Sequence, residues 1–240
     1  MTREDIYAAV QSRIAEQDLF AASAFVLGLG DTQAVAVTCE NLILDCYHKA
    51  KSIAQVLHFG SAGIHYCLAA ALVLDGKNAT AARELRLAAK RMATNVASFT
   101  WPGWDEPGIA ITPEQRRQGL MFARFSVRQL HELDPSAAQM AFTYWYLGAH
   151  LMADRQYAEA QSVFESALAY NREHGADPEG RLMLEGYVGL TNLLAGQEQC
   201  GETAFQSAVA ALQARESEDA QFYAAQLITA RAVFAPPKSL

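Results

Sequence analysis

The sequence predicts an all-α protein made of antiparallel helix hairpins, and three observations lead to this fold class. Alanine, the strongest helix former, supplies 45 of the 240 residues. Apolar residues recur every three or four positions, and no segment shows the strict alternation of a half-buried strand. Turn residues recur about every 13 to 20 positions, and such short connections place successive helices antiparallel to each other.

The boundaries of the predicted helices follow from the turn residues. Thr112 begins a Thr-Pro-Glu-Gln capping box with proline at the first helical position, and Ser136 begins a second capping box directly after Asp134-Pro135. Asp177-Pro178 begins another helix, and glycines near 76 and 196 mark short turns. The prediction is twelve helices, at residues 3–16, 18–28, 31–44, 46–58, 61–75, 78–97, 113–133, 136–153, 157–173, 179–195, 199–215 and 217–234.

A fixed spacing of small and large residues recurs along the chain. Gly148 is followed after twelve residues by Ala160, after four more by Phe164 and after three more by Ala167. Small residues at the first two positions let the helices of a hairpin approach closely, and Phe164 is expected to fill the space between successive hairpins. The same spacing occurs at Gly189, Gly201, Phe205 and Ala208, at Ala69, Ala81, Leu85 and Ala88, and more loosely at Thr38, Ala50, Ala54 and Leu57.

This spacing resembles that of the tetratricopeptide repeat (TPR), most closely over residues 141–216. The resemblance implies a right-handed superhelix of hairpins. The copies start 31, 79 and 41 residues apart, whereas the usual period is about 34 residues. The longest gap holds a loop at 98–112 and a helix at 113–133 that has no hairpin partner. We therefore predict a break in the middle, between degenerate repeats at 1–97 and the TPR-like repeats that complete 113–234, with a short tail at 235–240.

Composition and charge narrow the classes of function. The chain has 19 Lys and Arg against 26 Asp and Glu, a net charge of −7, which argues against a nucleic-acid partner. The polar start and apolar stretches of about ten residues predict neither a secretory signal nor a membrane-spanning segment. The four cysteines have no zinc spacing and no phosphate-binding glycine motif occurs, so we expect a cytoplasmic protein without metal or cofactor.

The TPR resemblance also suggests a binding groove. In TPR proteins the first helix of each hairpin lines a concave groove, and some members hold a peptide's terminal carboxylate there with basic residues. No basic residue stands at the matching positions here, so that clamp is not expected. The predicted groove is apolar and aromatic, suited to a protein segment, although these side chains could instead serve only for packing. Its residues are Tyr66, Phe142, Trp145, Met152, Met183 and Leu190.

The loop at 98–112 is the second candidate site. It carries Trp101 and Trp104 among prolines and glycines, too apolar to be a flexible linker. At least one tryptophan is expected to be mostly buried near helix 113–133; alternatively the loop is partly a recognition element. Asp105 and Glu106 follow, but no Ser/His/Asp or Cys/His motif accompanies them, so no catalytic residue is predicted.

The leading hypothesis from the sequence is a non-enzymatic scaffold, adaptor or chaperone that binds another protein. Two alternatives stay open. One is a regulatory or sensor module that binds a peptide or a small ligand inside the superhelix. The other is an enzyme with its site near Trp101–Glu106 and a nearby histidine. The sequence identifies neither the partner nor the oligomeric state.

Overall fold

The computed structural model describes residues 1–133, 137–174 and 177–235, and this part of the chain is all-α, as predicted. It contains eleven α-helices, one short 3₁₀ helix (η1) and no strand. The helices are α1 (Arg3–Glu16), α2 (Leu19–Leu27), α3 (Thr32–His48), α4 (Ile53–Leu74), α5 (Ala79–Phe99), η1 (Pro102–Trp104), α6 (Pro113–Glu132), α7 (Ala137–Ala153), α8 (Tyr157–His174), α9 (Pro178–Leu194), α10 (Glu198–Gln213) and α11 (Glu218–Phe234).

The predicted starts of α6 and α9 are confirmed. Thr112 Oγ1 accepts a hydrogen bond from the Gln115 amide, and the Gln115 side chain accepts one from the Thr112 amide, which completes the capping box. Asp177 caps α9, with Pro178 as its first residue. The predicted capping box at Ser136 and the residues of the tail beyond 235 lie outside the described residues.

The predicted helices at 46–58 and 61–75 are wrong, because one helix, α4, runs through residues 53–74. Its glycines do not interrupt it. A Cβ atom added at Gly60 would lie 2.3 Å from Val96 of α5, and one at Gly63 would lie 2.6 Å from Met92. These glycines therefore serve close helix packing. The turn lies instead at 49–52, so Ala50 sits outside any helix and the loose copy of the spacing from Thr38 has no hairpin to match.

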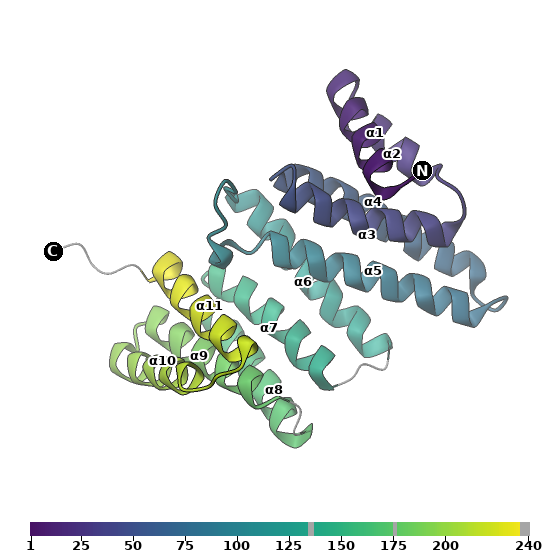
Figure 1. Ribbon diagram of the computed structural model, residues 1–240. Helices are drawn as coiled ribbons and strands as arrows, with labels where there is room; N and C mark the ends of the chain where they lie inside the picture. Colours follow the sequence, from purple (N-terminus) through teal and green to yellow (C-terminus); the bar gives the residue numbers. More distant parts are fainter. Residues whose placement is uncertain (134–136, 175–176, 236–240) are drawn as a thin grey trace.

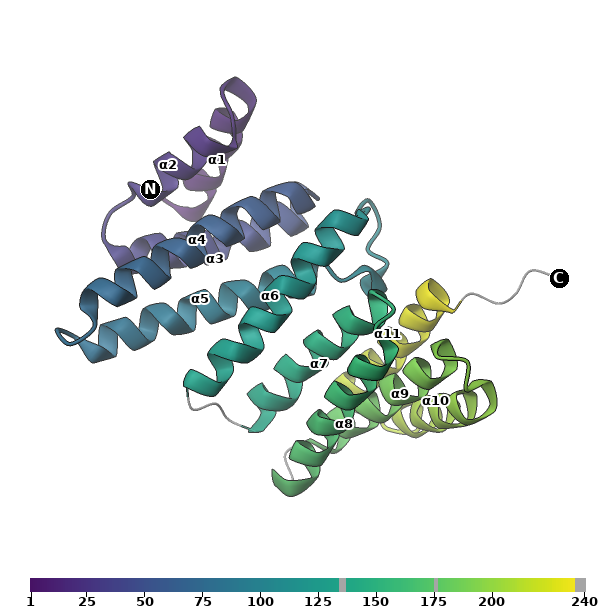
Figure 2. The ribbon, with the colours of Figure 1, turned by 180° about the vertical axis from the view of Figure 1, so that it is seen from behind.

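The helices stack in chain order. From α3 to α10 each helix packs against the next, and α3 also contacts α5 as α4 contacts α6, which gives two alternating layers. Figure 1 shows α3 to α7 side by side, and in the view from behind α4, α6 and α8 face the viewer (Figure 2). The hairpin of α1 and α2 packs on α3 and α4 at one end, and α11 packs on α9, α10 and η1 at the other.

The buried side chains divide into two clusters. The N-terminal cluster has buried members from Val10 to Val96, and the C-terminal cluster has buried members from Ala97 to Ala230. Phe122 of α6 is partly buried and packs against both clusters. Helix α6 packs against α5 and α7, so the stack continues through the region where a break was predicted. What divides the molecule is its core, because the two clusters of buried side chains meet at α6.

The recurrent spacing has its expected role in the second half of the chain. A Cβ atom at Gly148 would lie 2.5 Å from the Phe164 ring, and one at Gly189 would lie 2.5 Å from the Phe205 amide nitrogen. Phe164 is fully buried and stacks on Tyr187 of the next hairpin, with ring centroids 5.4 Å apart, so its predicted filling role is confirmed. In the copy from Ala69 the first position is exposed, so this copy is not equivalent to the others.

Candidate functional site

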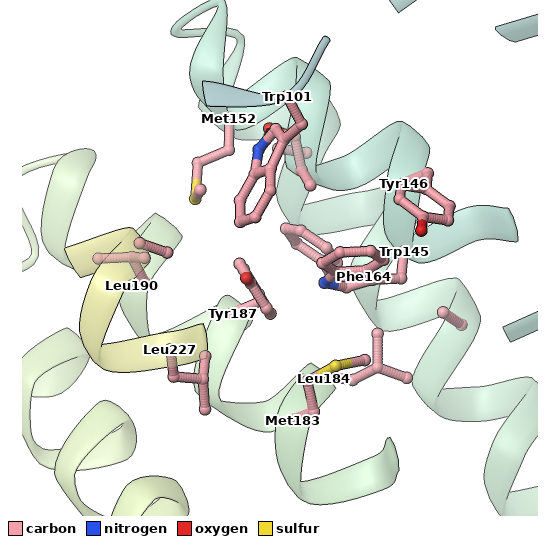
Figure 3. Close-up of a cluster of buried hydrophobic side chains, with 14 of the residues drawn as sticks. Trp101, Trp145, Tyr146, Met152, Phe164, Met183, Leu184, Tyr187, Leu190 and Leu227 are labelled. Carbon is pink, nitrogen blue, oxygen red and sulfur yellow. Dashed lines mark hydrogen bonds between the residues drawn. The ribbon is translucent and has the colours of Figure 1, made fainter. Parts of the chain in front are cut away.

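The 98–112 loop is folded onto the C-terminal cluster. Trp101 is fully buried, and its Nε1 donates a hydrogen bond of 3.2 Å to the Ala149 carbonyl of α7. Its ring lies 5.6 Å from the ring of Trp145 and 6.1 Å from that of Tyr187, measured between centroids (Figure 3). Trp104 is half-buried and its Nε1 donates to the Ser98 carbonyl at 2.8 Å. The prediction that at least one tryptophan is buried is confirmed.

Trp101 was expected near helix 113–133, and its ring contacts to other helices are made with α7, α9 and α11. The preceding residue, Thr100, packs on α6, where a Cβ atom at Gly119 would lie 2.1 Å from its Oγ1. Trp101 itself contacts rings on α7, α9 and α11, the last through Phe234 at a centroid distance of 6.1 Å. The loop thus fills the space beside the helices that were expected to line a groove.

The six residues of the predicted groove therefore do not form one open surface. Trp145, Met152, Met183 and Leu190 are all at most 3% exposed and belong to the C-terminal cluster (Figure 3). Tyr66 is partly buried in the N-terminal cluster. Of the six, Phe142 is exposed, at 43%. The chain covers this region with its own loop and with α11.

The two acidic residues of the loop differ in their partners. The Glu106 carboxylate pairs with Lys51, whereas Asp105 is exposed in a left-handed conformation at φ 49°. Both line a hollow of about 190 Å³, together with aromatic and apolar side chains and with no described histidine. Burial, with the Glu106 charge adding to it, raises the pKa of Tyr47 in this hollow to about 12. Nothing in this arrangement resembles a nucleophile aligned with a base.

Two larger hollows lie elsewhere, along α4. One hollow of about 710 Å³ lies between α4 and α6, and another of about 650 Å³ lies between α4, α2 and the start of α6. Both are lined by Ser61 and Gln118, so they join into one surface, here named the α2–α4–α6 groove. Its apolar lining residues are Leu19, Phe20, Leu27, Ala54, Leu57, Ala62, Ile64, Leu68, Met121, Phe122 and Phe125.

The charged residues of this groove are of one sign. Arg124 and Arg128 of α6 line it together with His58 and His65 of α4, and no Asp or Glu among the described residues does so. Arg124 has a carboxylate within reach, the Glu159 side chain of α8 at 3.4 Å, while the Arg128 guanidinium lies 5.4 Å from the Phe125 ring centroid. The groove is thus apolar with a cationic edge, on a chain of net charge −7.

Apolar side chains are also exposed beside this groove. Phe20 is 76% exposed, Met121 69% and Leu72 69%, values unusual for large apolar residues. Helix α4 is long and apolar enough to cross a membrane by length and composition, a property that the sequence prediction missed because it divided the helix in two. A core helix of a soluble protein can meet the same criterion, and α4 packs against α3 and α5.

Lys90 of α5 lines a separate cavity, unlike the arginines near it on the same helix. Arg86 and Arg91 form ion pairs with Asp75 and Glu40. Lys90 instead lies half-buried at a cavity of about 330 Å³ whose other walls come from α7, α8, α9 and α11. The sequence prediction did not include Lys90 among the candidate site residues, because Lys90 belongs to none of the helices expected to line a groove.

No group of three or more His, Cys, Asp or Glu side chains within the described ranges is placed to hold a metal ion. The comparisons with known proteins also give no assignment. No protein-family model matches the chain, and no curated protein or solved structure gives a significant match.

Proposed function

We propose that the protein is a non-enzymatic interaction module that holds an acidic, amphipathic helical segment of another protein in the α2–α4–α6 groove. The observation that carries the proposal is the continuous apolar lining with Arg124 and Arg128 and with no Asp or Glu among its described lining residues. The proposal keeps the class of function predicted from the sequence, a scaffold, adaptor or chaperone. It places the binding surface on α4 and α6 instead of on α7 and α9.

The dimensions of the groove favour a helix as the bound segment. Its lining on α4 extends from Ala54 to Leu68, which corresponds to about 21 Å at the 1.5 Å rise per residue of an α-helix. A partner helix of about four turns would match this length. An amphipathic helix docks by apolar anchors at positions i, i+3 or i+4, and i+7, the pattern that a long apolar groove selects.

The charges of the groove favour an acidic partner. Arg124 and Arg128 would face carboxylates on the flanks of the bound helix. This charge complementarity would speed association with an acidic segment and disfavour a basic one. The TPR resemblance of hairpins α7–α8 and α9–α10 is compatible with an interaction module, but it stays a prediction and the proposal does not depend on it.

The proposal can be tested by selecting binders from a random peptide display library on the purified full-length protein. We expect the selected peptides to combine helically spaced apolar residues with Asp or Glu. Met121→Glu places a carboxylate on an exposed wall of the groove and should weaken the selected peptides at least tenfold. Ile228→Glu on α11, where Ile228 is 47% exposed outside the groove, is the matched control and should not change their affinity.

Two results would contradict the proposal. The first is a set of selected peptides that are basic or lack the apolar spacing, or that bind Met121→Glu as tightly as the parent protein. The second is binding of the protein to vesicles of phosphatidylglycerol, lost in Met121→Glu, with no peptide selected. That second result would assign the exposed apolar residues to a lipid surface.

A further inference from the structure

We propose that the cavity beside Lys90 is a binding site for a small monocarboxylic acid with an apolar body, independent of the α2–α4–α6 groove. The acid's carboxylate would face the Lys90 ammonium group, and its apolar body would lie on Phe142, Met183 and Leu184. The cavity of about 330 Å³ is at the small end of ligand sites. It has room for about ten non-hydrogen atoms, at roughly 30 Å³ for each water-sized group.

Within the described part of the chain, the Lys90 ammonium group makes one side-chain hydrogen bond. Its Nζ donates a hydrogen bond of 3.1 Å to Thr143 Oγ1, which in turn donates to the Gln139 carbonyl at 2.7 Å. An ammonium group has three protons to donate, and no ion pair joins Lys90 to a carboxylate of any described residue. By contrast, Lys49 pairs with Glu4 and Lys51 pairs with Glu106.

The position of Lys90 disfavours its positive charge. Burial lowers the pKa of Lys90, and the nearby Arg91 charge lowers it further. A partly buried cation is stabilised by an anion at hydrogen-bonding distance, and a carboxylate that binds there would reverse the effect of burial. The protein thus presents a partly buried cation at the wall of this cavity.

The acidic residue that lines the same cavity does not supply this anion. Asp177 Oδ1 accepts hydrogen bonds from the amides of Glu179 and Gly180, at 3.0 and 2.9 Å, and so is committed to the first turn of α9. The other titratable group that faces the cavity is Tyr223, whose pKa is raised by burial and by the Asp177 charge. Asp177 and Tyr223 therefore line the part of the cavity that the end of the ligand opposite its carboxylate would contact.

These surroundings select a monocarboxylate over a phosphate. A phosphate carries up to two negative charges and is usually held by arginines or by free amides at a helix start. Here the α9 amides are occupied by Asp177, no arginine lines the cavity, and the Asp177 charge opposes a second negative charge. One ammonium group beside an apolar wall matches one carboxylate on an apolar body.

The test measures binding of three acids, 3-phenylpropionate, 4-methylpentanoate and hexanoate, each beside its uncharged amide, by isothermal titration calorimetry. We expect saturable binding of at least one acid and at least tenfold weaker binding of the corresponding amide. Lys90→Met should weaken the acid at least tenfold, and Lys90→Arg should retain it within a few-fold. Lys77→Met, at an exposed lysine in the turn before α5, is the matched control and should bind as the parent does.

Circular dichroism of each variant separates loss of the site from loss of the fold. The proposal is overturned if none of the three acids binds saturably at millimolar concentration. It is equally overturned if acid and amide bind alike, or if a folded Lys90→Met variant keeps the affinity of the parent. Peptide binding in the α2–α4–α6 groove is measured separately, so the two proposals can fail independently.

Discussion

The two halves of the molecule bury their helices with different side chains. The C-terminal cluster is rich in large rings, among them Trp101, Trp145, Phe164 and Tyr187. The N-terminal cluster is built mainly from valine, alanine, leucine and cysteine, with Phe59 as its largest fully buried side chain. In the C-terminal half a loop and α11 supply rings that fill the space beside α7 and α9, whereas in the N-terminal half the space beside α4 stays open. A surface of a helix stack is available to a partner only where the chain does not cover it.

The largest expected effect tests the role of the loop as the filler of the C-terminal half. Trp101→Ala should lower the free energy of unfolding by about 3–5 kcal/mol, because it removes a fully buried ring and leaves a cavity. Urea unfolding followed by circular dichroism gives this value. Trp104→Ala, at a half-buried ring of the same loop, is the control and should cost clearly less. Equal losses, or a loss below about 1 kcal/mol for Trp101→Ala, would show that the loop is only attached to the surface.

An effect of intermediate size concerns a buried histidine of α7 that faces α5 and α6. His150 is fully buried, its Nε2 donates a hydrogen bond of 2.7 Å to the Ala97 carbonyl, and burial lowers its pKa to about 4. The unfolded chain takes up a proton near pH 6.5, so the folded form is fully favoured above that pH and loses stability as the pH falls toward 4. The loss reaches about 3 kcal/mol over this range.

Urea unfolding at several pH values measures this slope. In His150→Gln the amide can still donate to the Ala97 carbonyl but cannot titrate, so the slope between pH 6.5 and 4 should be reduced by the contribution of His150. An unchanged slope in the variant would assign the acid sensitivity to other groups.

The smallest expected effect tests close helix approach in the C-terminal half. Gly189→Ala should cost about 1–3 kcal/mol, since the added methyl group would lie 2.5 Å from the backbone nitrogen of Phe205. Gly28→Ala is the control, because its methyl group would meet the Ala24 carbonyl at an ordinary 3.4 Å. The midpoint temperatures of thermal unfolding of the two variants measure this difference in stability. Equal midpoints would show that α9 and α10 can separate without cost.

Much of the fold could be predicted from the sequence because its signals are local. Thr112 and Asp177 cap their helices through neighbouring amides, and the spacing from Gly148 to Phe164 lies within one hairpin. The division of α4 at Gly60 was wrong because a glycine that breaks a helix and one that admits a neighbour look the same in sequence. The distinction depends on Val96, which is far along the chain.

The site was harder to predict because burial depends on distant segments. Trp145 and Leu190 have the pattern of groove residues, but both are buried in the C-terminal cluster, which also includes Trp101 and residues of α11. Lys90 shows the reverse case. It lies near other basic residues on α5. It differs from Arg86 and Arg91 because α7 brings Thr143 to its ammonium group, whereas each of these arginines pairs with a carboxylate.

The position of Trp101 at the start of its cluster has a consequence for synthesis of the chain. All buried members of the N-terminal cluster precede residue 97, so none of them waits for a residue of the C-terminal half. Trp101 must wait for Phe234, 133 residues later, before its last ring partner exists. At 5–20 residues per second this takes roughly 7 to 27 seconds. Until then the Trp101 ring lacks the contact with Phe234 that the complete fold provides.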